Sequence, residues 1–88
     1  MARVVWKYPL AMRGWNAISV GACSKIVLVD IDPAEGGPAI WIEHQLPIKV
    51  TRRFGVFPTG AEIAADGKHV GSCIDRTFVW HIYEQDQG

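Results

Sequence analysis

The alternation of side-chain types near the end of the chain predicts a central β-strand. Residues 77–84 read Thr-Phe-Val-Trp-His-Ile-Tyr-Glu. Successive side chains of a strand point to opposite faces, and the two faces here are Phe78, Trp80 and Ile82 against Val79, His81 and Tyr83. Neither face is charged before Glu84, whereas the outer face of an exposed edge strand is polar. We therefore expect this strand to be central in its sheet, or to be covered by a second layer or another subunit.

Other runs of alternating or β-branched residues predict strands over residues 4–10, 25–31, 39–46, 48–57 and 68–74. Segments rich in glycine, proline and aspartate separate them. Residues 30–38 contain Asp-Pro and Gly-Gly and predict the loop of a β-hairpin. Residues 11–23 indicate an irregular connection with at most a short strand over 17–20, and residues 61–65 a single helical turn or a short strand.

These patterns predict a mainly β fold. No window repeats its apolar positions every 3.6 residues over three turns, and five or six strand candidates follow one another about every ten residues. We expect a small twisted antiparallel sheet, sandwich or half-barrel with at most one short helical turn, in a single domain over residues 1–88. A domain of this size buries only about 60 to 65% of its unfolded surface, so oligomerisation is an expected source of further stability.

Within the predicted strands, one arginine interrupts an apolar face. Arg52 shares a face with Ile48, Val50, Phe54 and Val56. An arginine on such a face needs a partner or water, because burying it unpaired costs several kcal/mol. In the preceding strand, the better core candidates are Ile40, Ile42, His44 and Leu46.

Composition and charge narrow the possible partners. Nine basic residues balance nine acidic ones, so no overall field favours DNA, RNA or an anionic membrane, and nucleic acid is not the expected partner. No apolar run is long enough for a transmembrane helix, and the start of the chain does not resemble a signal peptide, which predicts a cytoplasmic protein. Cys23 and Cys73 are expected to be free thiols, because a single bridge is not a disulfide framework.

Neither catalysis nor metal binding is expected, and no cofactor is implied. The chain lacks a nucleophile elbow, a phosphate-cradling loop and paired carboxylates, so we do not expect an enzyme. His69 and Cys73 are predicted to share a strand face near His81, with Cys23 as a further ligand, but the paired spacing of structural zinc ligands is missing. For His81 we expect a structural role in which the ring donates to a backbone carbonyl.

The side chains that favour ligand binding are arginines and aromatic residues. The candidate binding residues are Arg52, Arg53, Arg76, Trp41, Trp80 and Tyr83, with Trp15 and Phe54 as further aromatic faces. Guanidinium groups bind phosphate through several hydrogen bonds, and aromatic faces stack on nucleobases, so the combination favours a nucleotide. The alternative is that the tryptophans belong to the core and the arginines pair with Asp30, Asp32 or Glu43.

The order of landmarks along nearly the whole chain resembles a family of small domains of unknown function found in phage and prophage genomes. The matching segments are Val5-Trp6-Lys7-Tyr8-Pro9-Leu10, Gly21-Ala22, Trp41, Arg53-Phe54, Pro58-Thr59-Gly60, His69-Val70-Gly71 and the closing Phe78-Val79-Trp80-His81-Ile82-Tyr83-Glu84. In that family the Thr-Gly turn is usually followed by a histidine, whereas Ala61 stands here. The resemblance implies a phage accessory protein and implies no activity.

We therefore expect a non-catalytic phage protein that neutralises host defence by binding. The most specific form of this hypothesis is a homo-oligomeric sponge in the host cytoplasm that sequesters a nucleotide-derived immune signal. One alternative is an inhibitor that covers a host defence protein, such as a CRISPR effector, by protein–protein contact. Another is a minor virion or morphogenesis protein.

Overall fold

Seven β-strands make up the regular structure of the chain, in a computed structural model that describes residues 2–12, 14–64 and 66–85, except for the side chain of Lys49. In chain order they are β1 (Arg3–Pro9), β2 (Trp15–Gly21), β3 (Lys25–Ile31), β4 (Pro38–Gln45), β5 (Ile48–Pro58), β6 (Gly67–Asp75) and β7 (Phe78–Gln85). No helix occurs within these described ranges, so none of them contains a helix that could cross a membrane. The prediction of a mainly β fold is confirmed, with one strand more than the largest number expected.

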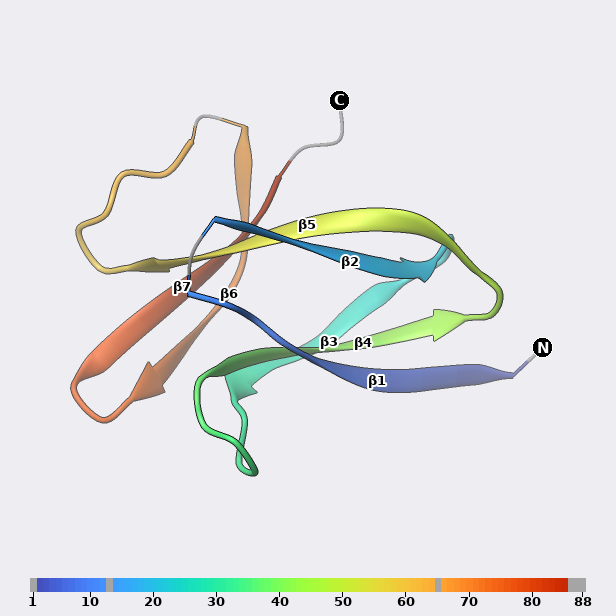
Figure 1. Ribbon diagram of the computed structural model, residues 1–88, viewed down its shortest axis with the longest axis horizontal. Helices are drawn as coiled ribbons and strands as arrows, with labels where there is room; N and C mark the ends of the chain where they lie inside the picture. The colour runs from blue at the N-terminus through green and yellow to red at the C-terminus, as the bar shows by residue number, and fades with distance from the viewer. Residues whose placement is uncertain (1, 13, 65, 86–88) are drawn as a thin grey trace.

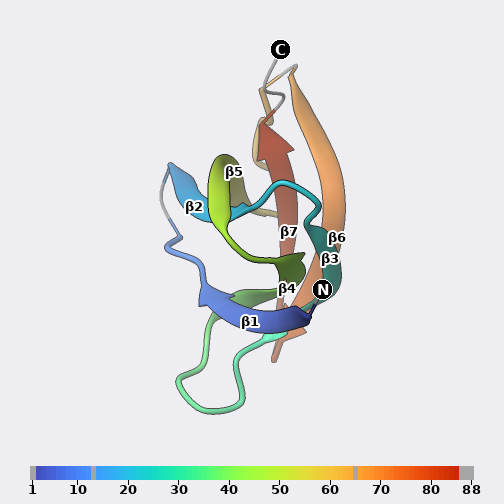
Figure 2. The ribbon, with the colours of Figure 1, turned by 90° about the vertical axis from the view of Figure 1, so that its right-hand side faces the viewer.

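The strands form two antiparallel sheets. The first has the order β1-β4-β3 and the second the order β2-β5-β7-β6 (Figure 1). Strands β4 and β5 follow each other in the chain but belong to different sheets, and the connection between them contains a cis Leu46–Pro47 peptide bond. Viewed from the side, β6 and β7 run steeply across the direction of β1 (Figure 2). Strand β7 lies between β5 and β6, which confirms that the strand predicted over residues 77–84 is central, although it begins at Phe78 and ends at Gln85.

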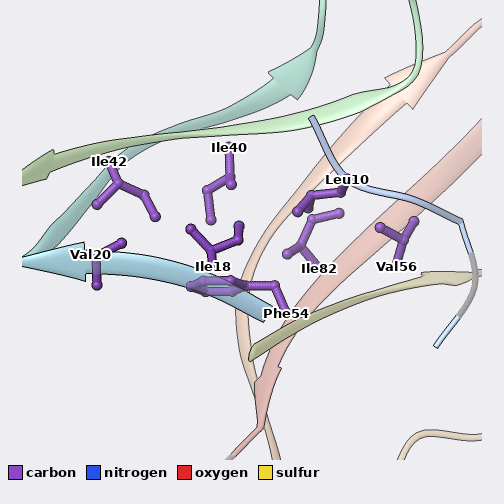
Figure 3. Close-up of a cluster of buried hydrophobic side chains, with 8 residues drawn as sticks. All are labelled: Leu10, Ile18, Val20, Ile40, Ile42, Phe54, Val56 and Ile82. Atoms are coloured by element: carbon purple, nitrogen blue, oxygen red, sulfur yellow. The ribbon is translucent and has the colours of Figure 1, made fainter. Parts of the chain in front are cut away.

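The hydrophobic core lies between the inner faces of the two sheets (Figure 3). Its buried apolar side chains are Leu10, Ile18, Val20, Ile40, Ile42, Phe54, Val56 and Ile82. Burying one such side chain contributes about 1.5–3 kcal/mol to folding. The predicted core face of β4 is confirmed for Ile40, Ile42 and His44, whereas Leu46 lies beyond the end of the strand and is exposed.

Strand β2 is longer than the sequence indicated. Residues 15–21 pair with β5 along their whole length, although the pattern predicted at most a strand over residues 17–20. Ile18 and Val20 point into the core, while the alternate positions carry small or polar residues, so the apolar contrast along the segment is weak. By contrast, residues 61–64 form neither a helical turn nor a strand.

A register shift in β2 brings Gly21 against the buried His44. The Gly21 N–H donates to His44 Nδ1 at 3.1 Å, so this nitrogen is unprotonated and Nε2 carries the ring proton towards the Tyr8 hydroxyl at 3.3 Å. A Cβ atom at Gly21 would collide with the backbone carbonyl of Gln45. This position therefore requires glycine.

Two β-bulges face each other where the edge strands of the two sheets approach. The pairing skips Val27 in β3 and Val70 in β6. Between them, Val29 packs so closely on Gly71 that a Cβ there would lie 2.8 Å from Val29 Cγ2. The extra residue in β6 reverses the alternation of side chains, and the sequence alone gives no sign of it.

Asp32 is the second buried polar residue and lies just after β3. The pKa of its carboxyl group is lowered, first by a hydrogen bond from the Ala34 N–H at 2.9 Å and then by the Lys7 ammonium, whose Nζ lies 3.1 Å from Oδ1. Lys7 therefore ties β1 to the loop between β3 and β4.

Candidate functional site

Four aromatic rings lie in a continuous row on the outer face of the four-stranded sheet, one from each strand. They are Trp15 of β2, Phe57 of β5, Tyr83 of β7 and His69 of β6, which we call the ring row. Successive ring centroids lie 5.7, 5.8 and 5.2 Å apart, with interplanar angles of 67°, 87° and 61°. These are edge-to-face contacts, which aromatic pairs favour over a direct sandwich.

Strand register and one glycine build the ring row. Trp15 and Tyr83 are both opposite Gly55, and His69 is opposite Tyr83. A Cβ at Gly55 would lie 2.9 Å from Phe57 Cε2 and 3.1 Å from Trp15 Cε3, so the glycine leaves space for the Phe57 ring between its neighbours. The row thus crosses the whole sheet without a gap.

A chain of hydrogen bonds between imidazole and hydroxyl groups adjoins the ring row. Thr59 Oγ1 lies 2.9 Å from His81 Nε2, His81 Nδ1 lies 2.8 Å from Ser72 Oγ, and Ser72 Oγ lies 3.0 Å from His69 Nε2. We call these four side chains the imidazole–hydroxyl chain. The prediction that His81 donates to a backbone carbonyl is wrong, because both of its ring nitrogens face hydroxyl groups.

His69 and His81 do not form a metal site with Cys73. The bulge at Val70 places His69 on the outer face opposite Tyr83, while Cys73 is buried on the inner face opposite Trp80. The expectation that His69 and Cys73 share a face is therefore wrong. Within residues 2–12, 14–64 and 66–85, no three His, Cys, Asp or Glu side chains gather closely enough to hold a metal ion.

Arg52 is held inside the molecule. It lies on the inner face of β5, where Nε donates to Glu84 Oε2 at 2.7 Å, Nη2 donates to Oε1 at 2.6 Å, and Nη1 donates to Ser24 Oγ at 2.9 Å. Its guanidinium carbon also lies 5.3 Å from the centroid of the Phe54 ring. The expectation that this arginine needs a partner is confirmed, and the partner is Glu84 rather than Asp30, Asp32 or Glu43.

The other predicted binding residues are spread over the molecule. Arg53 and Tyr83 share the outer face of the four-stranded sheet, where Arg53 is exposed opposite Ala17. Trp41 is half-buried on the outer face of the three-stranded sheet, opposite Lys7 and Leu28.

Trp80 packs against the core and stacks on Phe78 with ring centroids 5.9 Å apart. Arg76 has a positive φ of 59° in the turn between β6 and β7. Of the six predicted binding residues, only Arg53 and Tyr83 therefore lie on the same face as the ring row.

The sequence did not indicate Phe57, Thr59 or Ser72 as site residues. Phe57 has the same alternation as Arg53, so its position on the outer face was available from the pattern of β5. Its neighbours in the ring row come from three other strands, however, and only the sheet order β2-β5-β7-β6 brings them together. Ser72 gave no signal, because a lone serine in a strand is usually just an exposed polar residue.

Two further surfaces are mainly apolar. An open groove of about 300 Å³ between the edge strands is lined by Ile26, Val27, Leu28, Val29, Val70, Gly71 and Ser72. On the outer face of the three-stranded sheet, Val5 and Leu28 are 49% and 46% exposed on either side of the strand that carries Trp41.

Comparison with known proteins identifies a family and no activity. The chain matches, over residues 1–88, a family described as a domain of unknown function (DUF7352). The match covers the whole chain, so the protein belongs to this family. No curated protein and no solved structure matches it.

Proposed function

We propose that this DUF7352 protein is a non-catalytic binding protein that captures a nucleotide-type ligand on the outer face of its four-stranded sheet. The observation that carries the proposal is the ring row, which offers aromatic groups from four neighbouring strands; Trp15, Phe57 and Tyr83 are half-buried and His69 is exposed. Stacking a base on an aromatic side chain contributes about 1–3 kcal/mol, and every base has a face that can stack. A sheet surface of this kind suits ligands of one or a few bases.

Polar groups on both sides of the ring row support the same proposal. The imidazole–hydroxyl chain adjoins it on one side. Arg53 lies on the other side, two residues from Gly55 along β5, which corresponds to about 7 Å. Guanidinium, hydroxyl and imidazole groups all bind phosphate and ribose oxygens. The site thus combines stacking surfaces with hydrogen-bonding groups at a suitable distance.

The biological role that we propose is sequestration. The resemblance to small phage and prophage domains supports an accessory protein that removes a nucleotide-derived signal of host immunity. Such a sponge requires affinity and no transition-state stabilisation, so the site needs no catalytic group. A homo-oligomer that encloses the ligand between subunits would provide the additional burial that a domain of this size lacks.

The test is a thermal-shift screen of the purified protein with mononucleotides, cyclic nucleotides and ADP-ribose derivatives. A ligand that binds only the folded protein at 100 times its Kd stabilises it by about 2.7 kcal/mol. At about 4–8 °C per kcal/mol, we expect a rise in Tm of about 10–20 °C.

The matched variants are Tyr83→Ala, which interrupts the ring row, and Trp41→Ala, which removes an aromatic side chain from the opposite side of the molecule. Tyr83→Ala should weaken binding at least about fivefold, because even the lower stacking value of about 1 kcal/mol has that effect. Trp41→Ala should bind as the unmodified protein does. Equal weakening in both variants, or no shift with any nucleotide, would contradict the proposal.

The second candidate function is occlusion of a host protein. The exposed Val5 and Leu28 beside Trp41 favour it, because a protein–protein contact needs an apolar centre. In this case a host protein should be retained by the unmodified chain and by Tyr83→Ala, and lost with Trp41→Ala. The two candidates thus predict opposite effects for the same pair of variants.

A further inference from the structure

We infer that the ligand of the ring row carries a phosphate group and that the imidazole–hydroxyl chain binds this phosphate. The inference rests on the proposed function, because it assigns the other half of the same ligand. It goes beyond that function by naming the phosphate-binding residues as Thr59, His69, Ser72 and His81 rather than an arginine.

The surroundings of the Ser72 hydroxyl carry the argument. Its oxygen lies 3.0 Å from His69 Nε2 and 2.8 Å from His81 Nδ1. A hydroxyl group has one proton and can donate to only one of these nitrogens, so the other nitrogen donates its own N–H to the oxygen. At least one imidazole N–H therefore points at a single exposed oxygen atom, as it would at an oxygen of a bound phosphate.

The imidazole–hydroxyl chain has more polar hydrogens than its internal hydrogen bonds use, so it can donate to an anion. Each of the four side chains carries at least one polar hydrogen, and in the free protein these hydrogens are shared among neutral oxygen and nitrogen acceptors. A phosphate would replace those acceptors with charged oxygens. Hydrogen bonds to a charged acceptor are roughly twice as strong as those between neutral groups. The exchange therefore favours the anion.

The imidazole–hydroxyl chain lies where the phosphate of a nucleotide would lie if its base stacked on the ring row. His69 belongs to both the ring row and the imidazole–hydroxyl chain. Its ring centroid lies 5.2 Å from that of Tyr83, and its Nε2 lies 3.0 Å from Ser72 Oγ. His81 lies on the same strand face as Tyr83, two residues or about 7 Å away. A base on the ring row thus has the imidazole–hydroxyl chain beside it at a distance that a sugar spans.

Charge gives the inference a signature that distinguishes it from binding through arginine. A nearby phosphate favours the protonated form of an imidazole, so binding at His69 and His81 takes up a proton. The other ionisable side chains described on this face are Tyr83 and Arg53. Glu62 and Asp66 lie in the connection between β5 and β6 and would oppose an anion. Arginine stays protonated, so binding through Arg53 would take up no proton.

The test is isothermal titration calorimetry of the whole chain with adenosine, AMP and inorganic phosphate. At about pH 7 we expect AMP to bind at least about tenfold more tightly than adenosine, because hydrogen bonds to the charged phosphate add to the stacking of the base. The binding enthalpy of AMP should change with the ionisation enthalpy of the buffer, because a proton is taken up. Ser72→Ala should remove the advantage of AMP, whereas Ser19→Ala, an exposed serine of β2 on the same face, should keep it.

The outcomes separate this inference from the proposed function. Equal affinity for AMP and adenosine would overturn the phosphate assignment and leave the stacking site intact. Proton-linked binding of inorganic phosphate, without binding of adenosine or AMP, would support the phosphate site and overturn the stacking site. An advantage of AMP that disappears in Arg53→Ala and persists in Ser72→Ala would assign the phosphate to the arginine instead. If none of the three compounds binds, both assignments are wrong.

Discussion

The pair of Arg52 and Glu84 gives the sharpest prediction about stability. The guanidinium group donates two parallel hydrogen bonds of 2.7 and 2.6 Å to one carboxylate, and a third of 2.9 Å to the Ser24 hydroxyl. The two charged side chains are only 20% and 17% exposed. We propose to replace Arg52 by methionine, which keeps the length of the aliphatic part and removes all of these bonds.

The expected cost follows from this geometry. A hydrogen bond to a charged group contributes about 1.5–3 kcal/mol when it is buried, and solvent screens an exposed ion pair to about 0–1 kcal/mol. Here most of each side chain is buried and a minor part is wet, so we expect Arg52→Met to lower the free energy of unfolding by about 2–3 kcal/mol. Part of this cost is the carboxylate of Glu84 left without its partner.

The assay is urea unfolding monitored by far-UV circular dichroism, on a complete double-mutant cycle. It compares the unmodified protein with Arg52→Met, Glu84→Gln and the double variant. We expect the summed losses of unfolding free energy in the two single variants to exceed the loss in the double variant by about 1–2 kcal/mol. The reason is that the second substitution removes a group that the first has already left without its partner. Arg53→Met is the matched control on the exposed face, where the change should stay within about 0.5 kcal/mol.

Additive effects in this cycle, within about 0.3–0.5 kcal/mol, would refute the reasoning. They would mean that the contact between Arg52 and Glu84 contributes nothing specific to the folded state. In that case the guanidinium group would again be a candidate for binding a ligand. A coupled pair instead assigns Arg52 to the fold and leaves recognition to the outer face.

Two further predictions concern the loops and the β2 bulge. Gly21→Ala should lower the free energy of unfolding by about 1–3 kcal/mol or more in the same urea assay. The new methyl group meets the backbone carbonyl of Gln45, which cannot rotate away as a side chain would. A variant as stable as the original would disprove this contact. Asp32 has a lowered pKa in the folded state, so its carboxylate stabilises the fold above its ordinary pKa of 3.8, and this contribution is lost as the pH falls through the lowered value. Asp32→Asn should therefore lose less unfolding free energy than the unmodified protein when the pH falls below about 4. An unchanged pH dependence in this range would contradict the prediction.

Much of the fold follows from local pattern. Residues 25–31 form a strand with the predicted bounds, and the central strand was recognised because both of its faces are uncharged before Glu84. Those signals depend only on neighbours in the sequence. Strand β2 was underestimated, since its outward positions include Ala17 and Ser19, which give little contrast with the core-facing residues.

The candidate site depends on long-range register, which the sequence does not encode in any local window. Arg52 was correctly expected to have a partner, but Glu84 becomes its neighbour only because β7 pairs beside β5. The assignment of His69 to the face of Cys73 failed because the extra residue Val70 reverses the alternation. The ring row requires four strands in one order and one register, and no single strand reveals it.

The facing irregularities at Val27 and Val70 also bear on how copies of this protein can associate. Each interrupts the pairing of an edge strand with its neighbour and bends that strand, so an incoming straight segment does not find a straight edge to pair with. Edge-to-edge pairing of copies into open-ended fibrils is thereby discouraged at β3 and β6. The sheet edges that carry no such bulge on their pairing with the neighbouring strand are β1, and β2 up to Val20.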